Sequence, residues 1–502
     1  MIDVGRAATY GGLLRAARRF ATGLVLTIYA AAPASADLIY FRNGGRIQAP
    51  AEQQGRTLSI DLCGTRYKFD QDDVEKRVPG FDVAVEWRSK REGLEGKSPE
   101  ERLAQAWWAL ENGLVDEAVE ELRRIHAVAP GHGATRRMVE VVDRLAAPCR
   151  DPEFEPFRAA LGVPMTVERG AHVLLLHQHD QAEAKERVEF LERVIATYHL
   201  VFAGSGMPLE TPRRRLVFAW FSDRADYRRF LETNAASAFA TTRGYFHPTW
   251  NAVAIYDARS SELQRSDGEG IARRSQELQA MQKVLESMPR NARIRLAISG
   301  ERPRVVGRTE GRAVLDRLTR DVRRTELLLE AERRAYDEGI SAHEMIHLLA
   351  ADSGLNPRHN AFPLWLQEGL AMQFEVVRGG RWAGVGRPHE IRLADWRTLP
   401  ATPALEPLLR DRGFGRGYRK EPYVQAWALV FFLRSRHADR FVRYLDLLRN
   451  PPETDATGPH AFQAFQRVFG EDLQSIEAEW LEYLAATKTP LDAHEPHPPK
   501  PE

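Results

Sequence analysis

The sequence predicts an α+β protein with a mixed sheet, helices that carry the candidate active site, and a mainly helical C-terminal part. A small β-module and a helical repeat are expected to precede it. Three observations support this prediction. Short apolar runs between 171 and 257 alternate with longer segments whose apolar residues recur every three or four positions. The segment from about 420 to 487 has helical periodicity. Residues 37–80 consist of short apolar runs separated by turn-forming residues.

Length and composition limit the class of protein. With 502 residues the chain exceeds the usual size of one domain, so we expect several modules. It is 43% hydrophobic and 28% charged, which is typical of proteins with packed cores. The 71 basic and 70 acidic side chains nearly cancel, giving a net charge of +1. We therefore expect no nucleic-acid partner.

Residues 1–36 have the features of a signal peptide. Arg15, Arg18 and Arg19 precede the apolar run "FATGLVLTIYAAA", and Ala34 and Ala36 stand where a signal peptidase would cleave. The prediction is export to a periplasm or to the outside of the cell. An uncleaved membrane anchor is the alternative. We expect no stable membrane span after cleavage, because no second run of about 18 apolar residues follows.

Two small modules are expected after this segment. Residues 37–90 are predicted to form a β-module with a hairpin near Asn43 and Gly44. Residues 98–146 look helical, and "WWALENGLVDEAVEELRRIHAVAPGH" resembles a tetratricopeptide repeat, with Gly113 at the expected turn. A single repeat offers little binding groove, so it is either a spacer or a contact for a protein partner.

The main domain is predicted to span 160–487. Its expected strands are residues 171–177, 214–221 and 243–257. Residues 259–338 are rich in Arg and Glu, which favours a charged, mostly helical insertion. The Pro-rich residues 488–502 are predicted to be disordered.

The two cysteines, Cys63 and Cys149, lie in different predicted modules. An exported protein can form disulfides, but the sequence does not determine whether these two residues pair.

The stretch "SAHEMIHLLA", residues 341–350, carries the candidate chemistry. His343 and His347 are four residues apart, so a helix would present both imidazoles on one face. Glu344 lies beside them, where its carboxylate could reach a water on a bound ion. Zinc suits such a set of donors. The motif H-E-x-x-H also arises by chance, so alone it is only a hypothesis.

A second segment strengthens the hypothesis. Glu368, within "PLWLQEGLAMQFE" (363–375), lies 21 residues after His347 (368 − 347), a separation at which a second helix could return a carboxylate to the first. We expect Glu368 to be the third ligand and Gly369 to allow close approach of helix and metal. Glu375 is expected to accept the free ring N–H of a ligating histidine.

Together, H-E-x-x-H and the downstream W-L-x-E-G-x-A resemble the gluzincins, zinc metallopeptidases, and especially the peptidase-MA-like domains of exported bacterial proteins. The resemblance covers about 165–485 and implies a zincin-like fold. It implies Zn²⁺ bound by His343, His347 and Glu368, with Glu344 as general base. A peptide or protein would then be the substrate.

A third match is the stretch "GYRKEPYVQAWALVFFL", which is similar to a helix of gluzincin aminopeptidases. It implies Tyr423 as a donor to the developing oxyanion, with Tyr418 as a supporting residue. The Gly-x-Met-Glu-Asn segment with which those enzymes bind a substrate amine is not found. An endopeptidase or a narrow-specificity peptidase is therefore expected, with substrate pairing along 243–257.

Two other functions remain open. In the first, zinc only joins two helices of a non-catalytic scaffold that binds partners through the repeat and the β-module. In the second, the site hydrolyses a substrate other than a peptide. An intact Glu344 argues against the scaffold, because a structural zinc site needs no such carboxylate.

Overall fold

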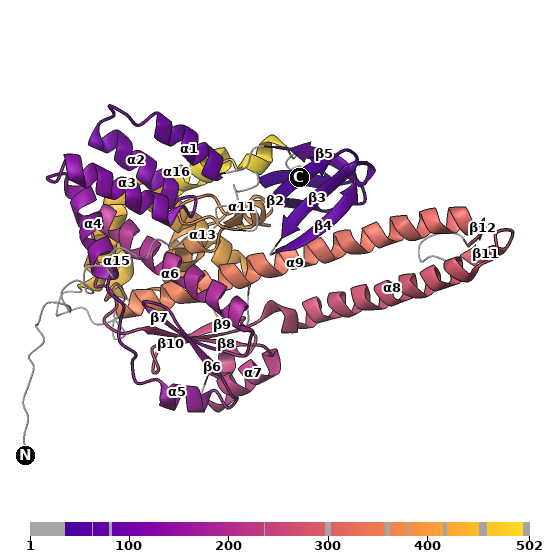
Figure 1. Cartoon of the computed structure of the whole chain (residues 1–502). Coiled ribbons are helices and arrows are strands. Elements are labelled where there is room, and N and C mark those ends of the chain that lie inside the picture. The colour runs from indigo at the N-terminus through magenta and orange to yellow at the C-terminus, as the bar shows by residue number, and fades with distance from the viewer. Residues whose placement is uncertain are drawn as a thin grey trace, which may run out of the picture.

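The structure is a computed structural model that describes residues 36–62, 64–79, 83–234, 236–296, 303–356, 362–378, 381–414, 419–450 and 459–494. Over these residues the chain is an α+β protein with several small sheets and many helices, as predicted (Figure 1). Almost all of the predicted signal peptide, together with Cys63 and Tyr418, lies outside the described residues. Cys149 has a free thiol.

The N-terminal module is a five-stranded antiparallel sheet in the order β4-β3-β2-β1-β5. Its strands are β1 (Ala36–Phe41), β2 (Arg46–Gln54), β3 (Thr57–Leu62), β4 (Thr65–Asp70) and β5 (Val74–Val78). Gly44 and Gly45, both at positive φ, make the β1–β2 turn. Helix α1 (Val83–Glu92) follows the sheet near the predicted module boundary at residue 90, and its Trp87 stacks on Trp108.

The segment predicted to be a helical repeat, residues 98–146, contains α2 (Pro99–Leu110), α3 (Val115–Val128) and α4 (Gly133–Leu145). Ser98 begins α2 with a capping box, in which its side chain accepts from Glu101 N–H and the Glu101 carboxylate accepts from Ser98 N–H. Buried residues of all three helices belong to the same hydrophobic core as helix α6 (Gln181–Gly204). The repeat is thus built into the main core.

The central sheet has the order β6-β7-β8-β10-β9, with β7, β8 and β10 parallel and both edge strands antiparallel. Its strands are β6 (Thr166–Arg169), β7 (Val173–His177), β8 (Leu216–Phe221), β9 (Gly244–His247) and β10 (Ala252–Tyr256). Alternate residues point to opposite faces. One face packs under α6 and α9 (Arg308–Asp352), and the other under α5 (Glu155–Ala160) and α7 (Arg224–Thr233).

The charged segment forms a long helical hairpin that projects from the body (Figure 1). It consists of α8 (Glu262–Ser287), a short pair of strands, β11 (Arg293–Leu296) and β12 (Arg304–Gly307), and the first half of α9. The boundary expected at residue 338 lies inside α9, because this 45-residue helix continues without a break into the H-E-x-x-H stretch. No helix among the described residues is long and apolar enough to cross a membrane.

Helices also dominate the C-terminal part. In chain order its elements are α10 (Leu364–Ala371), β13 (Val377–Arg378), β14 (Arg381–Trp382), α11 (Glu390–Arg397), α12 (Leu405–Leu409), α13 (Lys420–Arg436), α14 (Ala438–Arg449), α15 (Pro459–Phe469) and α16 (Leu473–Ala486). The predicted disorder of 488–502 is wrong at its start. Residues Pro490–Ala493 form a 3₁₀ helix, because Arg397 binds both carboxylate oxygens of Asp492 at 2.8 and 2.9 Å. Residues 495–502 lie outside the described ranges.

The repeat meets the main domain through two glycines. A Cβ on Gly384 would overlap the Leu110 carbonyl oxygen, and a Cβ on Gly113 would overlap that of Trp382. Both glycines also have positive φ, +70° and +71°. The turn between α2 and α3 therefore approaches the chain after β14 backbone to backbone, which leaves no room for a side chain.

Replacing Gly384 with alanine should lower the free energy of unfolding by about 2–4 kcal/mol, because strain at positive φ adds to overlap with a backbone atom that cannot move alone. Chemical denaturation measures this change. Gly162 is the matched control, since its φ is also +70° but a Cβ there would have nothing within 4 Å. Gly162→Ala should cost only about 1 kcal/mol. Equal losses in the two variants would contradict the close contact.

Candidate metal centre

Three of the predicted site residues lie on the C-terminal half of α9. His343 and Glu344 are buried, with 8% and 6% of their surface exposed, and His347 is half-buried. The helix is held against α6 just before this stretch. Arg187 of α6 donates to the Asp337 carbonyl oxygen at 2.7 Å and to the Ser341 hydroxyl at 2.6 Å. This anchoring sets the rotation of α9 that points its two histidines into a cavity.

Glu368 lies on the short helix α10, and a residue outside this helix holds its N-terminal end in place. The carboxylate of Asp411 accepts the backbone N–H groups of Leu364 and Trp365, both at 2.9 Å. These are N–H groups that a helix start leaves without an intrahelical partner. Trp365 is fully buried and stacks on Tyr444, with ring centroids 6.1 Å apart. The start of α10 is thereby fixed, three residues before Glu368.

Gly369 has a different role from the one predicted. A Cβ at this position would lie 2.5 Å from a methyl group of Val430 and 2.6 Å from the Ala426 carbonyl oxygen, both on α13. The glycine therefore permits close packing of α10 on α13. It does not make room beside a metal, because its missing side chain points away from the histidines.

The structure brings His343, His347 and Glu368 together. The two Nε2 atoms are 3.1 Å apart, and the Glu368 carboxylate oxygens lie 3.3 Å from Nε2 of His343 and 3.7 Å from Nε2 of His347. One ligand atom from each residue falls within 4.8 Å of the others. A tetrahedral ion with bonds of about 2.1 Å keeps its donors about 3.4 Å apart. The donor types and their spacing thus fit a divalent cation.

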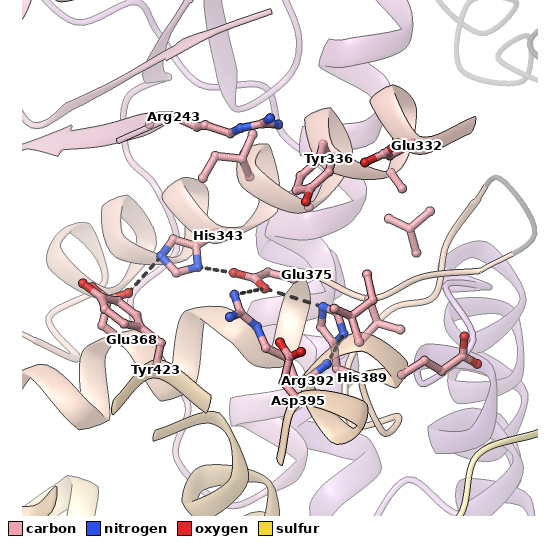
Figure 2. Close-up of a pocket in the computed structure, with 18 of the residues that line it drawn as sticks. Arg243, Glu332, Tyr336, His343, Glu368, Glu375, His389, Arg392, Asp395 and Tyr423 are labelled. Carbon is pink, nitrogen blue, oxygen red and sulfur yellow. Dashed lines mark hydrogen bonds and ion pairs between the residues drawn. The ribbon is translucent and has the colours of Figure 1, made fainter. Parts of the chain in front are cut away.

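Glu375, just after α10, supports His343 from the other side (Figure 2). His343 Nδ1–H donates to Glu375 Oε1 at 2.6 Å, and the Nε2 atom of the same ring faces His347 and Glu368. Arg392 donates to the other oxygen of Glu375 at 3.2 Å, and His389 Nε2 lies 3.6 Å from it. Predicted and observed contacts agree for Glu375, whereas Arg392 and His389 were not predicted.

The electrostatics of this cluster follow from burial and pairing. Burial opposes charge on His343, but its bonds to Glu368 and Glu375 outweigh burial and raise the pKa of His343 well above its ordinary value. Burial lowers the pKa of His347 to about 4, so this imidazole is neutral and can donate a lone pair. Against the effect of burial, Arg392 and His343 keep the pKa of the Glu375 carboxyl below its ordinary value.

Glu344 lies on the other side of the site, against the edge strand β9. A Cβ on Gly244 would come within 2.5 Å of Glu344 Cγ, so the strand backbone and this side chain are in contact. Burial raises the pKa of Glu344 to about 7, although the His343 charge and a hydrogen bond from the Phe246 backbone oppose the increase. A carboxylate with such a pKa can both accept and release a proton near neutrality.

A cavity of about 1570 Å³ surrounds the cluster. Its walls come from α9, β9, α10 and α11, and also from the β1–β2 turn of the N-terminal module and the chain around Asp492. Tyr423, near the start of α13, lines the same cavity, as the resemblance implies for an oxyanion donor. Tyr418 lies outside the described residues.

Sequence reasoning missed Gly244, His389 and Arg392. His389 begins α11, where its Nδ1 accepts from Arg392 N–H at 3.4 Å. Neither residue has a motif spacing relative to His343, so no local pattern identifies them. The only usable indication for Gly244 was its position in the expected substrate-pairing segment.

The substitution Glu375→Gln should weaken zinc binding about 10- to 100-fold, because an amide is a poorer acceptor for His343 Nδ1–H than a carboxylate. Competition with a chromogenic chelator measures the affinity. Glu390→Gln is the control, since the Glu390 carboxylate pairs with Arg378 and lines the same cavity. Unchanged zinc affinity in the Glu375 variant would show that this contact does not support a ligand.

The comparisons with known proteins give one match. A family model described as a protein of unknown function (DUF1570) matches residues 339–453, a range that includes His343, His347, Glu368, Glu375 and Tyr423. No curated protein matches this chain. No solved structure matches it either. The similarity to that uncharacterised family is therefore concentrated in the part of the chain that holds the candidate metal centre.

Proposed function

We propose that this chain is an exported zinc-dependent peptidase of gluzincin type that hydrolyses peptide bonds. The observation that carries the proposal is the convergence of two imidazoles and a carboxylate from α9 and α10 in a large cavity, with Glu344 beside them. Export rests on the sequence of residues 1–36 alone.

Zinc is the proposed ion because His343, His347 and Glu368 are three donors of the types that catalytic zinc sites use, and three protein ligands leave one position open. When bound, zinc supplies a Lewis acid that polarises a carbonyl oxygen and lowers the pKa of water to about 7. Glu375 orients His343 for this role through its 2.6 Å hydrogen bond.

Glu344 is proposed as general base and then general acid. Its carboxylate takes a proton from the attacking water as the water oxygen bonds to the peptide carbonyl carbon. When the C–N bond breaks, Glu344 returns this proton to the leaving nitrogen, so that an amine and a carboxylic acid are formed. Burial suits both steps, because it raises the pKa of this carboxyl to about 7.

Strand β9 is proposed to hold the substrate backbone. It pairs with β10 on one side and forms the edge of the central sheet on the other. An extended peptide can add to such an edge through backbone hydrogen bonds. The contact between Gly244 and Glu344 would place this peptide beside the general base.

The substitution Glu344→Gln should lower kcat for hydrolysis of an unstructured protein by at least 10³-fold while zinc content stays at one ion per chain, because the amide cannot accept the proton. Glu332→Gln is the matched control. Glu332 lies on the same helix and lines the same cavity, three turns earlier. It should change kcat by less than threefold.

The alternative of a zinc-joined scaffold predicts a different result for the same proteins. Zinc present without hydrolysis of any peptide, ester or amide by the wild type would contradict the peptidase proposal and favour the scaffold. Hydrolysis of esters or other amides without cleavage of peptides would support a catalytic metal centre but show that its substrate is not a peptide.

Tyr423→Phe should lower kcat about 10²-fold with little change in KM or zinc content, because in the proposed mechanism the phenol donates to charge that develops in the transition state. Tyr423 packs its ring on Phe414, with centroids 5.2 Å apart, and phenylalanine preserves this contact. An unchanged kcat would show that the Tyr423 phenol does not stabilise the transition state.

A further inference from the structure

Arg243 lies at the entrance of the proposed substrate strand, directly before Gly244 of β9. It lines the same cavity as His343, Glu344 and Glu368. Its guanidinium stacks over the ring of Tyr336 on α9, 4.2 Å from the ring centroid, and Figure 2 shows the two side chains together above His343. The ring fixes the direction of the guanidinium, so this cation is positioned in advance.

The guanidinium of Arg243 has a buried nitrogen, Nη1, without a hydrogen-bond partner. Burial raises the pKa of the Asp337 carboxyl to about 6, and Arg243 is one of the charges that oppose this increase, but the Asp337 Oδ1 atom accepts from the Ala258 N–H at 3.0 Å. An unpaired buried donor on a cation is unfavourable unless a ligand satisfies it. A ligand carboxylate in the cavity would supply the acceptor and the counter-charge that no described residue provides at ion-pair distance.

Four other cations of the cavity wall are each paired with a carboxylate, and no such ion pair is found for Arg243 among the described residues. Arg392 binds Glu375 at 3.2 Å, Arg397 binds Asp492 at 2.8 Å, and Arg378 lies 3.2 Å from Glu390. Lys420 pairs with Asp395. Each of these four charges is compensated by a carboxylate at ion-pair distance, whereas Arg243 lines the same cavity without such a carboxylate among the described residues.

We propose that Arg243 binds a carboxylate of the substrate, and so makes the cleft selective for peptides that carry a negative charge at one defined position. The inference rests on the proposed function, because it assigns specificity to that same site. A planar guanidinium suits this task, since it can donate two parallel hydrogen bonds to a carboxylate.

The spacing of two residues on α9 gives the position of that carboxylate in a peptide that runs beside this helix. Tyr336 and His343 are seven residues apart, which places them on one face of the helix and about 10 Å apart along its axis. An extended peptide advances about 3.3 Å per residue. The recognised carboxylate thus lies about three residues from the bond at the metal centre. It belongs either to the C-terminus or to an Asp or Glu side chain.

Binding to the zinc-loaded Glu344→Gln protein tests this without turnover. The probe is one fluorescent alanine-rich hexapeptide made in four forms, with a free or amidated C-terminus and with Glu or Gln at an internal position. We expect at least tenfold tighter binding of one charged form over its neutral twin. Preference for the free C-terminus or for internal Glu distinguishes the two sources of the carboxylate.

Arg243→Gln in the same background should abolish this preference, and Arg243→Lys should retain part of it because the charge remains. Lys420→Gln removes a paired cation from the same cavity and should leave the ratio unchanged. Equal binding of all four peptides, or a preference that persists in Arg243→Gln, would overturn the inference.

The two proposals fail separately. Hydrolysis of neutral peptides by the wild type, combined with equal binding of charged and neutral peptides, would uphold the peptidase and reject the role of Arg243. Charge-selective binding that depends on Arg243, without cleavage of any peptide by the wild type, would uphold the role of Arg243 and reject the peptidase.

Discussion

Two half-buried carboxylates hold His343 between them, Glu368 at its Nε2 side and Glu375 at its Nδ1 side, and the arrangement of α9, α10 and α11 depends on this contact. Buried ionisable groups are unfavourable unless they are paired. Each carboxylate is therefore compensated, Glu368 by His343 and Glu375 by His343 and Arg392. A cation between His343, His347 and Glu368 would complete this balance of charge.

The surrounding fold keeps these groups in place. Asp411 fixes the start of α10, Gly369 brings α10 close to α13, and Arg187 anchors α9 just before the histidines. The N-terminal sheet packs on the same long helix. Leu327 enters its core, and Arg320 binds Asp73 at 2.8 Å. The β1–β2 turn of this module consequently forms part of the cavity wall beside the metal centre.

The sequence predicted the parts of the site that depend on helical spacing. His343 and His347 share a face because they are four residues apart, and Glu368 and Glu375 follow on the next helical segment. The strands and the fold class were predictable from apolar periodicity for the same reason. Contacts between distant segments were not. Arg243 and Gly244 lie at an edge strand about a hundred residues before His343. No local sequence pattern indicates that this strand contacts the site. Likewise, the order at Asp492 depends on Arg397, far along the chain.

The central claim is that His343, His347 and Glu368 together bind one divalent ion, and a crystal of the full chain measured at the zinc absorption edge tests it most directly. We expect a single strong anomalous peak about 2.0–2.2 Å from both imidazole Nε2 atoms and from a Glu368 oxygen. A peak bound elsewhere, or a Glu368 side chain turned away from a metal held by the histidines, would contradict it.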